Sequence, residues 1–156
     1  VTERFDGTFP PAGWAVFDNG VGTTLSWESS TTSYSGAGAA YIDYDCSVTS
    51  NAEDWLVTPL IPITAGNSTL SYYHFQPDNS DYGSVYEVRV STSSQTVDTT
   101  FISVDTLLES GVPQAYTIYT VDLSAYVGQS VYIAFVHTQN CGDDYYIDEL
   151  AVGPTH

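Results

Sequence analysis

Hydrophobic and polar residues alternate along most of this chain, in short segments separated by turn-forming residues. No segment shows the three- and four-residue apolar spacing of an amphipathic helix. Clusters such as Pro10–Gly13, Pro77–Asn79 and Gly111–Pro113 carry typical turn chemistry between the segments. The pattern predicts strands at residues 2–5, 39–44, 55–58, 69–75, 85–91, 101–108, 116–122, 131–138 and 145–152, and one short helical turn at 123–126.

Many short strands at this spacing are typical of an all-β antiparallel sandwich or a jelly roll. The chain of 156 residues has the length of one domain with its own core, and neither a linker nor a change in composition divides it. We therefore predict a single antiparallel β-sandwich of jelly-roll type over residues 1–153. Residues 154–156 are predicted to be a linker or tail.

The charge balance restricts the partners of the domain. The chain has 19 Asp and Glu residues against 2 Lys and Arg residues, a formal net charge of −17. A polyanion repels phosphate backbones and anionic lipid headgroups, which excludes nucleic acid and membrane surfaces. No apolar run is long enough for membrane insertion. The same field attracts cations, and calcium takes the oxygen ligands that carboxylates and carbonyls supply.

Two carboxylates fall in line with core-facing residues. The even-numbered residues from 146 to 152 share one side of the last predicted strand, so Asp148 is expected to face the core. Glu3 is expected on the same side of the first strand as Phe5. An unpaired carboxylate facing a core costs several kcal/mol or becomes protonated, and the chain has only two arginines to neutralise its acids. We therefore predict a calcium ion at Glu3 and Asp148.

The two cysteines, Cys46 and Cys141, are predicted to form a disulfide. Few basic residues, many Tyr, Ser and Thr residues and an acidic composition fit a secreted protein, in which thiols tend to pair. The alternative is two unpaired thiols in turns. Acidic residues flank both cysteines, so a disulfide would bring four carboxylates together as a second calcium site. These four residues are Asp43, Asp45, Asp143 and Asp144.

Six short motifs follow one another in a fixed order along the chain. They are FPPAGW at 9–14 after ERFD at 3–6, DWLVTP at 54–59, YEVRVS at 86–91, VDLSAY at 121–126, VYIAF at 131–135 and IDEL at 147–150. In this order they resemble the cleaved adhesin domain family, also described as the choice-of-anchor J domain, which is MAM-like. That family occurs in the haemagglutinin/adhesin regions of gingipain-type bacterial proteases and in other secreted multidomain bacterial proteins. The resemblance implies a calcium-bearing, non-catalytic jelly-roll sandwich.

The resemblance also implies where a metal binds. The family's N-terminal E-x-F-E pattern matches Glu3 and Phe5, with Asp6 in place of the second Glu. Its C-terminal D-D-V pattern corresponds to residues 148–150, which begin with Asp148. Calcium sites of the family type join the first and last strands. The alternation of residues independently placed Glu3 and Asp148 in this region.

Little in the sequence indicates catalysis. No Gly-x-Ser-x-Gly elbow occurs, and His74 and His137 fall on core-facing positions without a motif partner. The acidic loop 78–83 departs from the EF-hand pattern and is interpreted as a turn. Carboxylate pairs for glycoside cleavage stay open on spacing alone. We expect a protein that is not an enzyme.

Aromatic residues are the candidate ligand-binding groups. Trp27 follows a loop, and Tyr34 and Tyr82 lie in predicted loops, where exposed rings can stack on sugars. The alternative is that a tyrosine-rich surface reflects only the β-propensity of these residues.

These observations lead to a non-catalytic, calcium-stabilised adhesion or binding module of a secreted bacterial multidomain protein. Its partner is expected to be a glycan or a protein of the cell surface or extracellular space. The alternative is a carbohydrate-binding module that targets a polysaccharide for an attached enzyme, and a third possibility is a spacer without a ligand. We expect the isolated domain to be monomeric.

Overall fold

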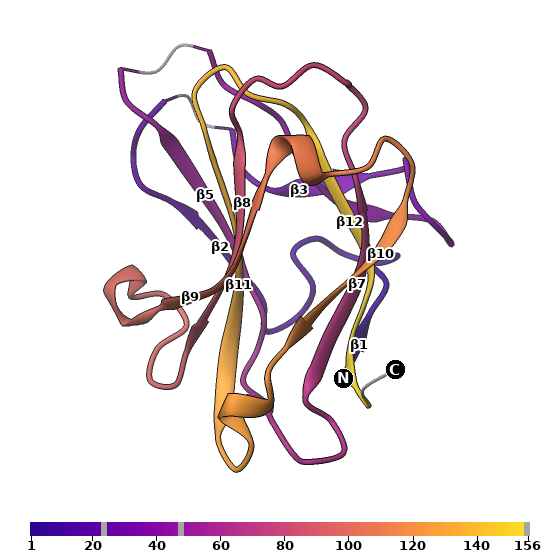
Figure 1. Cartoon of the computed structure of the whole chain (residues 1–156), viewed down its shortest axis with the longest axis vertical. Coiled ribbons are helices and arrows are strands. Elements are labelled where there is room, and N and C mark those ends of the chain that lie inside the picture. The colour runs from indigo at the N-terminus through magenta and orange to yellow at the C-terminus, as the bar shows by residue number, and fades with distance from the viewer. Residues whose placement is uncertain (23–24, 47–48, 155–156) are drawn as a thin grey trace.

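Two antiparallel sheets face each other in the computed structural model of the chain, which describes residues 1–22, 25–46 and 49–154 (Figure 1). Sheet A has the order β10 (Thr117–Asp122), β7 (Thr69–Phe75), β12 (Tyr145–Gly153), β4 (Ala39–Ile42) and β3 (Glu28–Ser30), with β1 (Thr2–Glu3) beside β12. Sheet B has the order β2 (Ala15–Asp18), β5 (Ala52–Val57), β11 (Ser130–Gln139), β8 (Val85–Ser91) and β9 (Ile102–Leu108), with β6 (Ile61–Pro62) beside β11. The predicted antiparallel β-sandwich of jelly-roll type is confirmed.

Each of the nine predicted strands is present; the strands at 69–75 and 85–91 have the predicted ends, and the other seven have shifted ends. The structure adds β2, β3 and β6, which span two to four residues and are too short to show an alternation. The first strand ends at Glu3 because the backbone turns at Phe5, which has a φ of 56°. The predicted turn at 123–126 is the 3₁₀ helix η3 (Ser124–Tyr126), and η1 (Asp98–Thr100) and η2 (Glu109–Gly111) flank β9. Residues 155 and 156 of the predicted tail lie outside the described residues.

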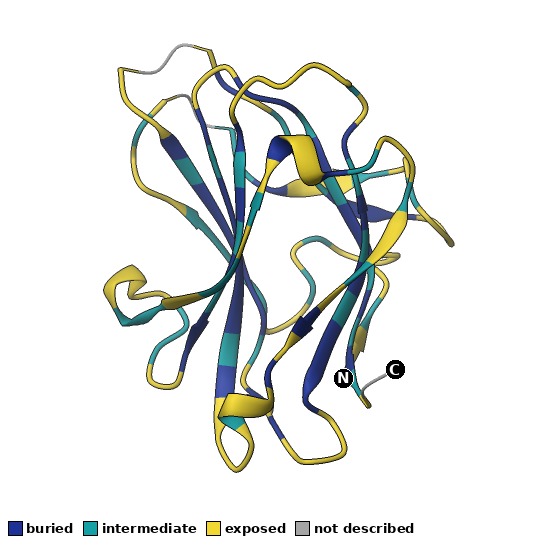
Figure 2. Ribbon diagram, in the orientation of Figure 1, coloured by how far each residue is buried: buried dark blue, intermediate teal, exposed yellow. Residues whose placement is uncertain are grey.

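The core fills the space between the sheets, as the burial colours show (Figure 2). Alternate residues of β11 such as Ile133 and Phe135 meet residues such as Leu70 and Ile147 of the opposite sheet. A smaller apolar cluster covers the outer face of sheet B, formed by Trp55, Val57, Ala134 and Val136. Strands β5 and β11 are therefore buried on both faces, which explains their nearly continuous apolar sequences. Among the described residues, no helix is long and apolar enough to cross a membrane.

A β-bulge changes the direction of the side chains in β12. The pairing of β12 with β7 shifts register between Asp148 and Ala151, and Glu149 has a φ of 48°. Residues 145 and 147 belong to the core before the bulge, and residues 150 and 152 belong to it afterwards. The prediction that residues 146, 148, 150 and 152 share one side is wrong, because the extra residue moves the alternation by one position. Asp148 is 0% exposed, but it lies on the outer face, beneath the backbone of Tyr34 and Ser35.

The predicted disulfide is present. Cys46 and Cys141 are bonded, with their Cα atoms 4.1 Å apart and a sequence separation of 95. The bond joins the loop after β4 to the turn between β11 and β12, and Cys141 N donates to Asp45 O at 2.7 Å. The loops at one end of the sandwich are thus held together covalently.

The disulfide closes a long loop, and its loss is expected to destabilise the domain. The double variant Cys46→Ser/Cys141→Ser should lower the free energy of unfolding by about 4–5 kcal/mol, because a closed loop of this length restricts the unfolded chain. Urea unfolding of the wild type and the variant measures the change. Both proteins should unfold alike in a strong thiol reductant, and equal midpoints without the reductant would contradict the prediction.

Candidate functional site

A row of aromatic rings crosses the outer face of sheet A. It consists of Tyr41 on β4, Tyr146 on β12, Phe75 on β7 and Tyr116 immediately before β10, and we call it the aromatic row. Tyr146 lies directly opposite Tyr41 and Phe75 in the strand pairing, with ring centroids 4.7 Å and 4.6 Å away. The row of contacting rings continues from Phe75 to Tyr116, and the centroids of these two rings lie 4.5 Å apart. All four rings are half-buried, so the row forms part of the surface.

The loop that follows β3 adds a further ring beside this row. Tyr34 stacks on Tyr73 of β7, with centroids 3.7 Å apart and an interplanar angle of 10°. Asp148 holds the loop in place, because its Oδ2 accepts hydrogen bonds from Tyr34 N at 2.9 Å and Ser35 N at 3.2 Å. Tyr116 Oη donates to Thr32 O at 2.7 Å and fixes the loop at a second point. The structure thus brings together Tyr34, a predicted ligand residue, and Asp148, a predicted metal residue.

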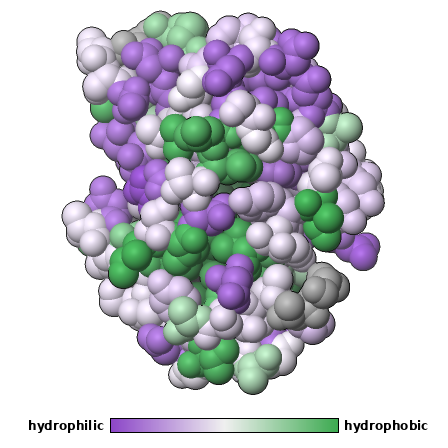
Figure 3. Space-filling view, viewed as in Figure 1, coloured by the Kyte–Doolittle hydropathy of each residue, from purple (hydrophilic) through white to green (hydrophobic). Residues whose placement is uncertain are grey.

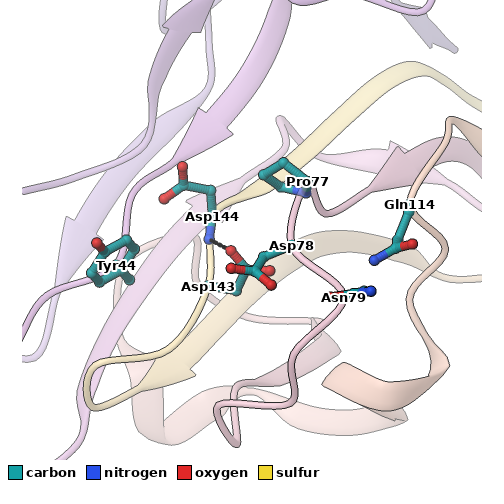
Figure 4. Close-up of a pocket in the computed structure, with 7 residues that line it drawn as sticks. All are labelled: Tyr44, Pro77, Asp78, Asn79, Gln114, Asp143 and Asp144. Atoms are coloured by element: carbon teal, nitrogen blue, oxygen red, sulfur yellow. Dashed lines mark hydrogen bonds between the residues drawn. The ribbon is translucent and has the colours of Figure 1, made fainter.

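A polar pocket of about 550 Å³ lies at the end of the aromatic row (Figure 4). The pocket residues Pro77, Gln114 and Asp144 stand two positions along the chain from Phe75, Tyr116 and Tyr146. Each strand therefore leads from the row into the pocket wall, and the two form one continuous surface. The pocket is lined by Tyr44, Pro77, Asp78, Asn79, Gln114, Asp143 and Asp144.

Hydrophilic residues dominate the end of the molecule where the loops after β4, β7 and β11 gather (Figures 1 and 3). A second pocket of about 200 Å³ lies beside the disulfide and shares Tyr44, Asp78 and Asp143 with the first. Tyr82 lines this second pocket, is 49% exposed, and donates from its Oη to Asp78 Oδ2 at 3.2 Å. Tyr34 and Tyr82 are both on the surface, but on different parts of it.

The predicted surface role of Trp27 is wrong. Its side chain is 3% exposed, its ring packs edge-on against Tyr145, and its Nε1 donates to Asp54 O at 3.2 Å. The adjoining edge strand β3 begins at the exposed residue Glu28, and alternation turns the preceding ring toward the core. The sequence pattern did not reveal that Trp27 faces the core, because β3 spans only three residues and is too short to show an alternation.

The four acids next to the cysteines do not form one cluster. Asp144 interacts with Asp43, and Asp143 interacts with Glu109 and Asp78. Asp45 instead lies near Asp54, whose pKa is raised by burial and then by the charges of Asp18 and Asp45. Within residues 1–22, 25–46 and 49–154, no group of three or more His, Cys, Asp or Glu side chains is arranged to hold a metal ion. The prediction of a single site formed by Asp43, Asp45, Asp143 and Asp144 is therefore wrong.

The first and last strands meet at a different group of carboxylates. Glu3 Oε1 accepts from Phe5 N at 2.7 Å, and Asp6 Oδ1 accepts from Ala37 N at 2.6 Å and Gly38 N at 3.0 Å. The backbone at Gly38 lies so close to the backbone at Phe5 that a Cβ on Gly38 would be 2.2 Å from the carbonyl oxygen of Phe5. Glycine is required at this position because any side chain would collide with the backbone.

Carboxylates therefore surround the loop of residues 34–38 from both termini. Asp148 accepts three backbone N–H groups, and burial raises its pKa above the ordinary value. Glu149 Oε1 accepts from Ser35 Oγ, and Arg4 Nε lies 3.6 Å from Glu149 Oε2. The oxygen donors Glu3, Asp6 and Asp148 fit the ligand preference of calcium.

The sandwich, the aromatic row and the pocket define the class of this protein as a β-sandwich binding domain. The family model of the Cleaved Adhesin Domain matches residues 1–152, so the chain belongs to the cleaved adhesin domain family. The resemblance inferred from the six motifs is thereby confirmed. Hemagglutinin A of Porphyromonas gingivalis (strain ATCC BAA-308 / W83) is 28% identical over 180 aligned positions, which cover 97% of this chain. The chain spans only 8% of the length of that relative.

Solved structures show the same fold. The K1 cleaved adhesin domain of Lys-gingipain from Porphyromonas gingivalis W83 has a TM-score of 0.79 at 21% identity, covering 100% of this chain and 98% of that domain. TmCBM61, solved in complex with β-1,4-galactotriose, has a TM-score of 0.63 at 14% identity, covering 97% of this chain and 94% of its own. At these identities the likeness concerns the fold alone.

The sequence analysis missed the aromatic row itself. Tyr41, Phe75 and Tyr146 occupy predicted strands, and each faces away from the core. The three rings become neighbours only when β4, β12 and β7 are paired in the sheet. This pairing depends on the strand register and on the bulge in β12. The signal that could have found Tyr41 and Phe75 was an aromatic residue on the polar side of each of two predicted strands, whereas uninterrupted alternation assigned Tyr146 to the core side.

The Asp43–Asp144 pair is expected to make stability depend on pH. Burial, followed by the hydrogen bond and charge of Asp43, raises the pKa of Asp144 to about 7. The folded state therefore holds a proton that the unfolded state has already released, and this stabilisation is lost as the pH rises from about 4 through 7. Asp144→Asn retains a hydrogen-bond donor without ionising. Its melting temperature relative to wild type should rise progressively between pH 5 and pH 8.

Thermal unfolding at several pH values measures this difference. The exposed residue Asp98 in η1 provides the control, because Asp98→Asn should shift the melting temperature by a similar amount at each pH. A difference between Asp144→Asn and wild type that stays constant from pH 5 to pH 8 would refute the shared proton.

Proposed function

We propose that this chain is a non-catalytic binding module of a secreted bacterial multidomain protein, and that it holds its partner on the outer face of sheet A. The observation that carries the proposal is the continuous surface formed by the aromatic row and the polar pocket. Membership of the cleaved adhesin domain family supports a role in adhesion. The chain spans only 8% of the length of Hemagglutinin A, which supports the proposal that it is one module of a longer protein.

The chemistry of the histidines supports a non-catalytic role. His74 and His137 are 2% and 0% exposed, and neither lines the pocket. Burial lowers the pKa of both to about 4, so they are neutral at physiological pH. His74 Nδ1 lies 2.7 Å from Tyr145 Oη, and His137 Nε2 lies 3.1 Å from Asp143 O. Both imidazoles thus serve buried hydrogen bonds rather than a nucleophile at the surface.

The second candidate is a carbohydrate-binding module, and the aromatic row favours it. Aromatic rings contact the apolar faces of sugars, while carboxylates and amides bind their hydroxyl groups. The row offers four rings, and Asn79, Gln114 and Asp144 of the pocket offer the polar groups. The fold of TmCBM61, solved with a bound galactotriose, supports this candidate. A protein of the cell surface is the competing partner.

Tyr146 is the best residue for testing the surface, because it contacts rings on both sides of β12. If the partner is a glycan, wild type should be retarded in gels containing one or more plant, algal or bacterial polysaccharides. Tyr146→Ala should reduce that retardation at least tenfold, since truncation of a central aromatic hot-spot residue costs about 2 kcal/mol or more, and about 1.4 kcal/mol is a factor of ten.

The matched control is Tyr132→Ala, which alters a half-buried tyrosine beside the outer cluster of sheet B. It should keep the retardation of the wild type. Equal retardation of wild type and Tyr146→Ala would remove the aromatic row from the binding surface. No retardation of wild type by any polysaccharide would reject the glycan candidate and leave a protein partner.

We further propose that calcium stabilises the junction of the first and last strands. Glu3 and Asp148 would hold it, and backbone carbonyls and water would complete its coordination. A calcium ion supplies positive charge to this group of acids. The cationic side chain that pairs with an acid in this region is Arg4, which contacts Glu149 and is 70% exposed. The ion would thereby stabilise the loop that carries Tyr34.

Calcium is expected to raise the melting temperature. A ligand that binds only the folded state at 100 times its Kd stabilises by about 2.7 kcal/mol, which corresponds to roughly 5–10 °C for a domain of this size. Differential scanning fluorimetry in millimolar calcium and in chelator measures the response. Asp148→Asn should reduce this response, beyond lowering the basal melting temperature through weaker bonds to the loop N–H groups. Identical melting temperatures of wild type in both buffers would reject calcium stabilisation.

A further inference from the structure

The domain holds one of its own arginines between an aromatic ring and two carboxylates, on the outer face of sheet B. The guanidinium carbon of Arg89 lies 4.9 Å from the ring centroid of Trp55. Arg89 Nε and Nη2 donate to the two carboxylate oxygens of Glu87 at 3.2 Å and 3.0 Å, and Nη1 donates to Glu53 Oε1 at 3.5 Å. Aromatic faces and carboxylates are the groups that a planar guanidinium binds best, so this arrangement shows a complete arginine site.

The smaller pocket, beside the disulfide, presents the same kinds of groups to solvent. Its volume is about 200 Å³, which is on the scale of one amino-acid side chain. Tyr44 and Tyr82 line it and are 43% and 49% exposed, and the carboxylates of Asp78 and Asp143 line it as well. No basic residue lines this pocket or the larger one beside it, within the part of the chain that the structure describes. The pocket therefore offers aromatic rings and negative charge without a cation of its own.

Asp143 is the acid of this pocket that is suited to receive a charged donor. It is 4% exposed, its Oδ1 accepts from Asp144 N at 2.8 Å, and its Oδ2 is buried without a hydrogen-bond partner. The neighbouring imidazole of His137 bonds the Asp143 carbonyl at 3.1 Å and is neutral, because burial lowers its pKa to about 4. Buried polar atoms in folded proteins are almost always bonded, so Asp143 Oδ2 is the acceptor left for a donor that enters the pocket.

The cation has to come from another molecule. The chain contains no lysine, and its two arginines act elsewhere, since Arg4 pairs with Glu149 and Arg89 pairs with Glu53 and Glu87. A net charge of −17 attracts basic segments of other proteins and raises the rate of encounter with them. Exposed rings beside several carboxylate oxygens favour a guanidinium over an ammonium group, because only the guanidinium is planar and presents five donors.

We propose that the pocket beside the disulfide takes an arginine side chain from a basic segment of a partner protein. The guanidinium would lie against the rings of Tyr44 and Tyr82 and bond to the carboxylates of Asp78 and Asp143. Tyr44, Asp78 and Asp143 also line the larger pocket, and Figure 4 shows them there, so the segment that carries the arginine would continue into that pocket and toward the aromatic row. The inference rests on the proposed binding role of this surface and names the chemistry of its protein partner.

Nuclear magnetic resonance titration of the isotope-labelled domain with the peptide acetyl-Gly-Gly-Arg-Gly-Gly-amide tests the proposal. The backbone amide resonances of Tyr82, Gly142 and Asp143 should shift and reach saturation, because these residues line the pocket. A peptide with citrulline in place of arginine has nearly the same shape and no charge, and it should bind at least tenfold more weakly. This comparison requires no substitution in the domain.

Variants of the domain locate the binding. Asp143→Asn and Tyr82→Ala should each weaken binding of the arginine peptide at least tenfold, and resonances outside the pocket show whether each variant remains folded. Asp98→Asn removes one charge at the exposed η1 and should bind as wild type does. Tyr146→Ala should also bind as wild type does, because Tyr146 does not line this pocket. The test with polysaccharides therefore stays separate from this one.

Three results would overturn the proposal. The first is equal binding of the arginine and citrulline peptides, or unchanged binding of the arginine peptide in both Asp143→Asn and Tyr82→Ala. The second is a set of small shifts spread over acidic residues of the whole surface without saturation, which would reflect only the net charge. The third is a response of the pocket to glucosamine but not to the arginine peptide, which would assign the pocket to an amino sugar.

Discussion

The lack of basic residues constrains every buried acid in this domain. The chain has 19 acidic residues and no lysine, and its two arginines already pair with Glu149, Glu53 and Glu87. Buried carboxylates must therefore be stabilised by other groups. Asp148 uses three backbone N–H groups, and burial together with the neighbouring Asp43 raises the pKa of Asp144 to about 7, which favours its neutral form. Glu109 and Asp143 each have one carboxylate oxygen that accepts a backbone N–H group. The buried acids thus depend on hydrogen bonds in place of ion pairs, and they fix different loops.

The bulge in β12 connects this constraint to the candidate binding surface. Without the extra residue at Glu149, Asp148 would lie on the same side of the strand as Leu150 and Val152, which belong to the core. The bulge places it on the outer face, where backbone N–H groups of the loop after β3 compensate its charge. The same bonds bring Tyr34 onto Tyr73, beside the aromatic row. A local backbone irregularity thus turns an expensive buried acid into the support of a surface loop, in agreement with the frequent occurrence of bulges next to functional sites.

The alternation of residues was sufficient to predict the sandwich, because most of the nine predicted strands show a period of two between turn-forming segments. It could not predict the side of Asp148, since a bulge interrupts the period without any mark in the sequence. Trp27 precedes a strand of three residues, too short to reveal its direction. The disulfide was predictable from two cysteines and composition, whereas the separation of the four acids beside it depends on which strand end each one occupies. Glu109 had no sequence signal, because its proximity to Asp143 arises only after β9 and β11 join the same sheet.

The division of work between strands and loops explains why this end of the sandwich suits a binding site. The aromatic row lies on paired strands, whose backbone hydrogen bonds fix the ring positions with little dependence on solvent conditions. The pocket beyond it is built from loops, which have no such ladder and need other restraints. The disulfide supplies one restraint between the loop after β4 and the turn before β12. It does not reach η2 or the β7–β8 loop. These two segments are joined by a hydrogen bond, because Tyr82 N donates to Glu109 Oε2. The covalent bond and this hydrogen bond therefore act on complementary parts of one end of the sandwich.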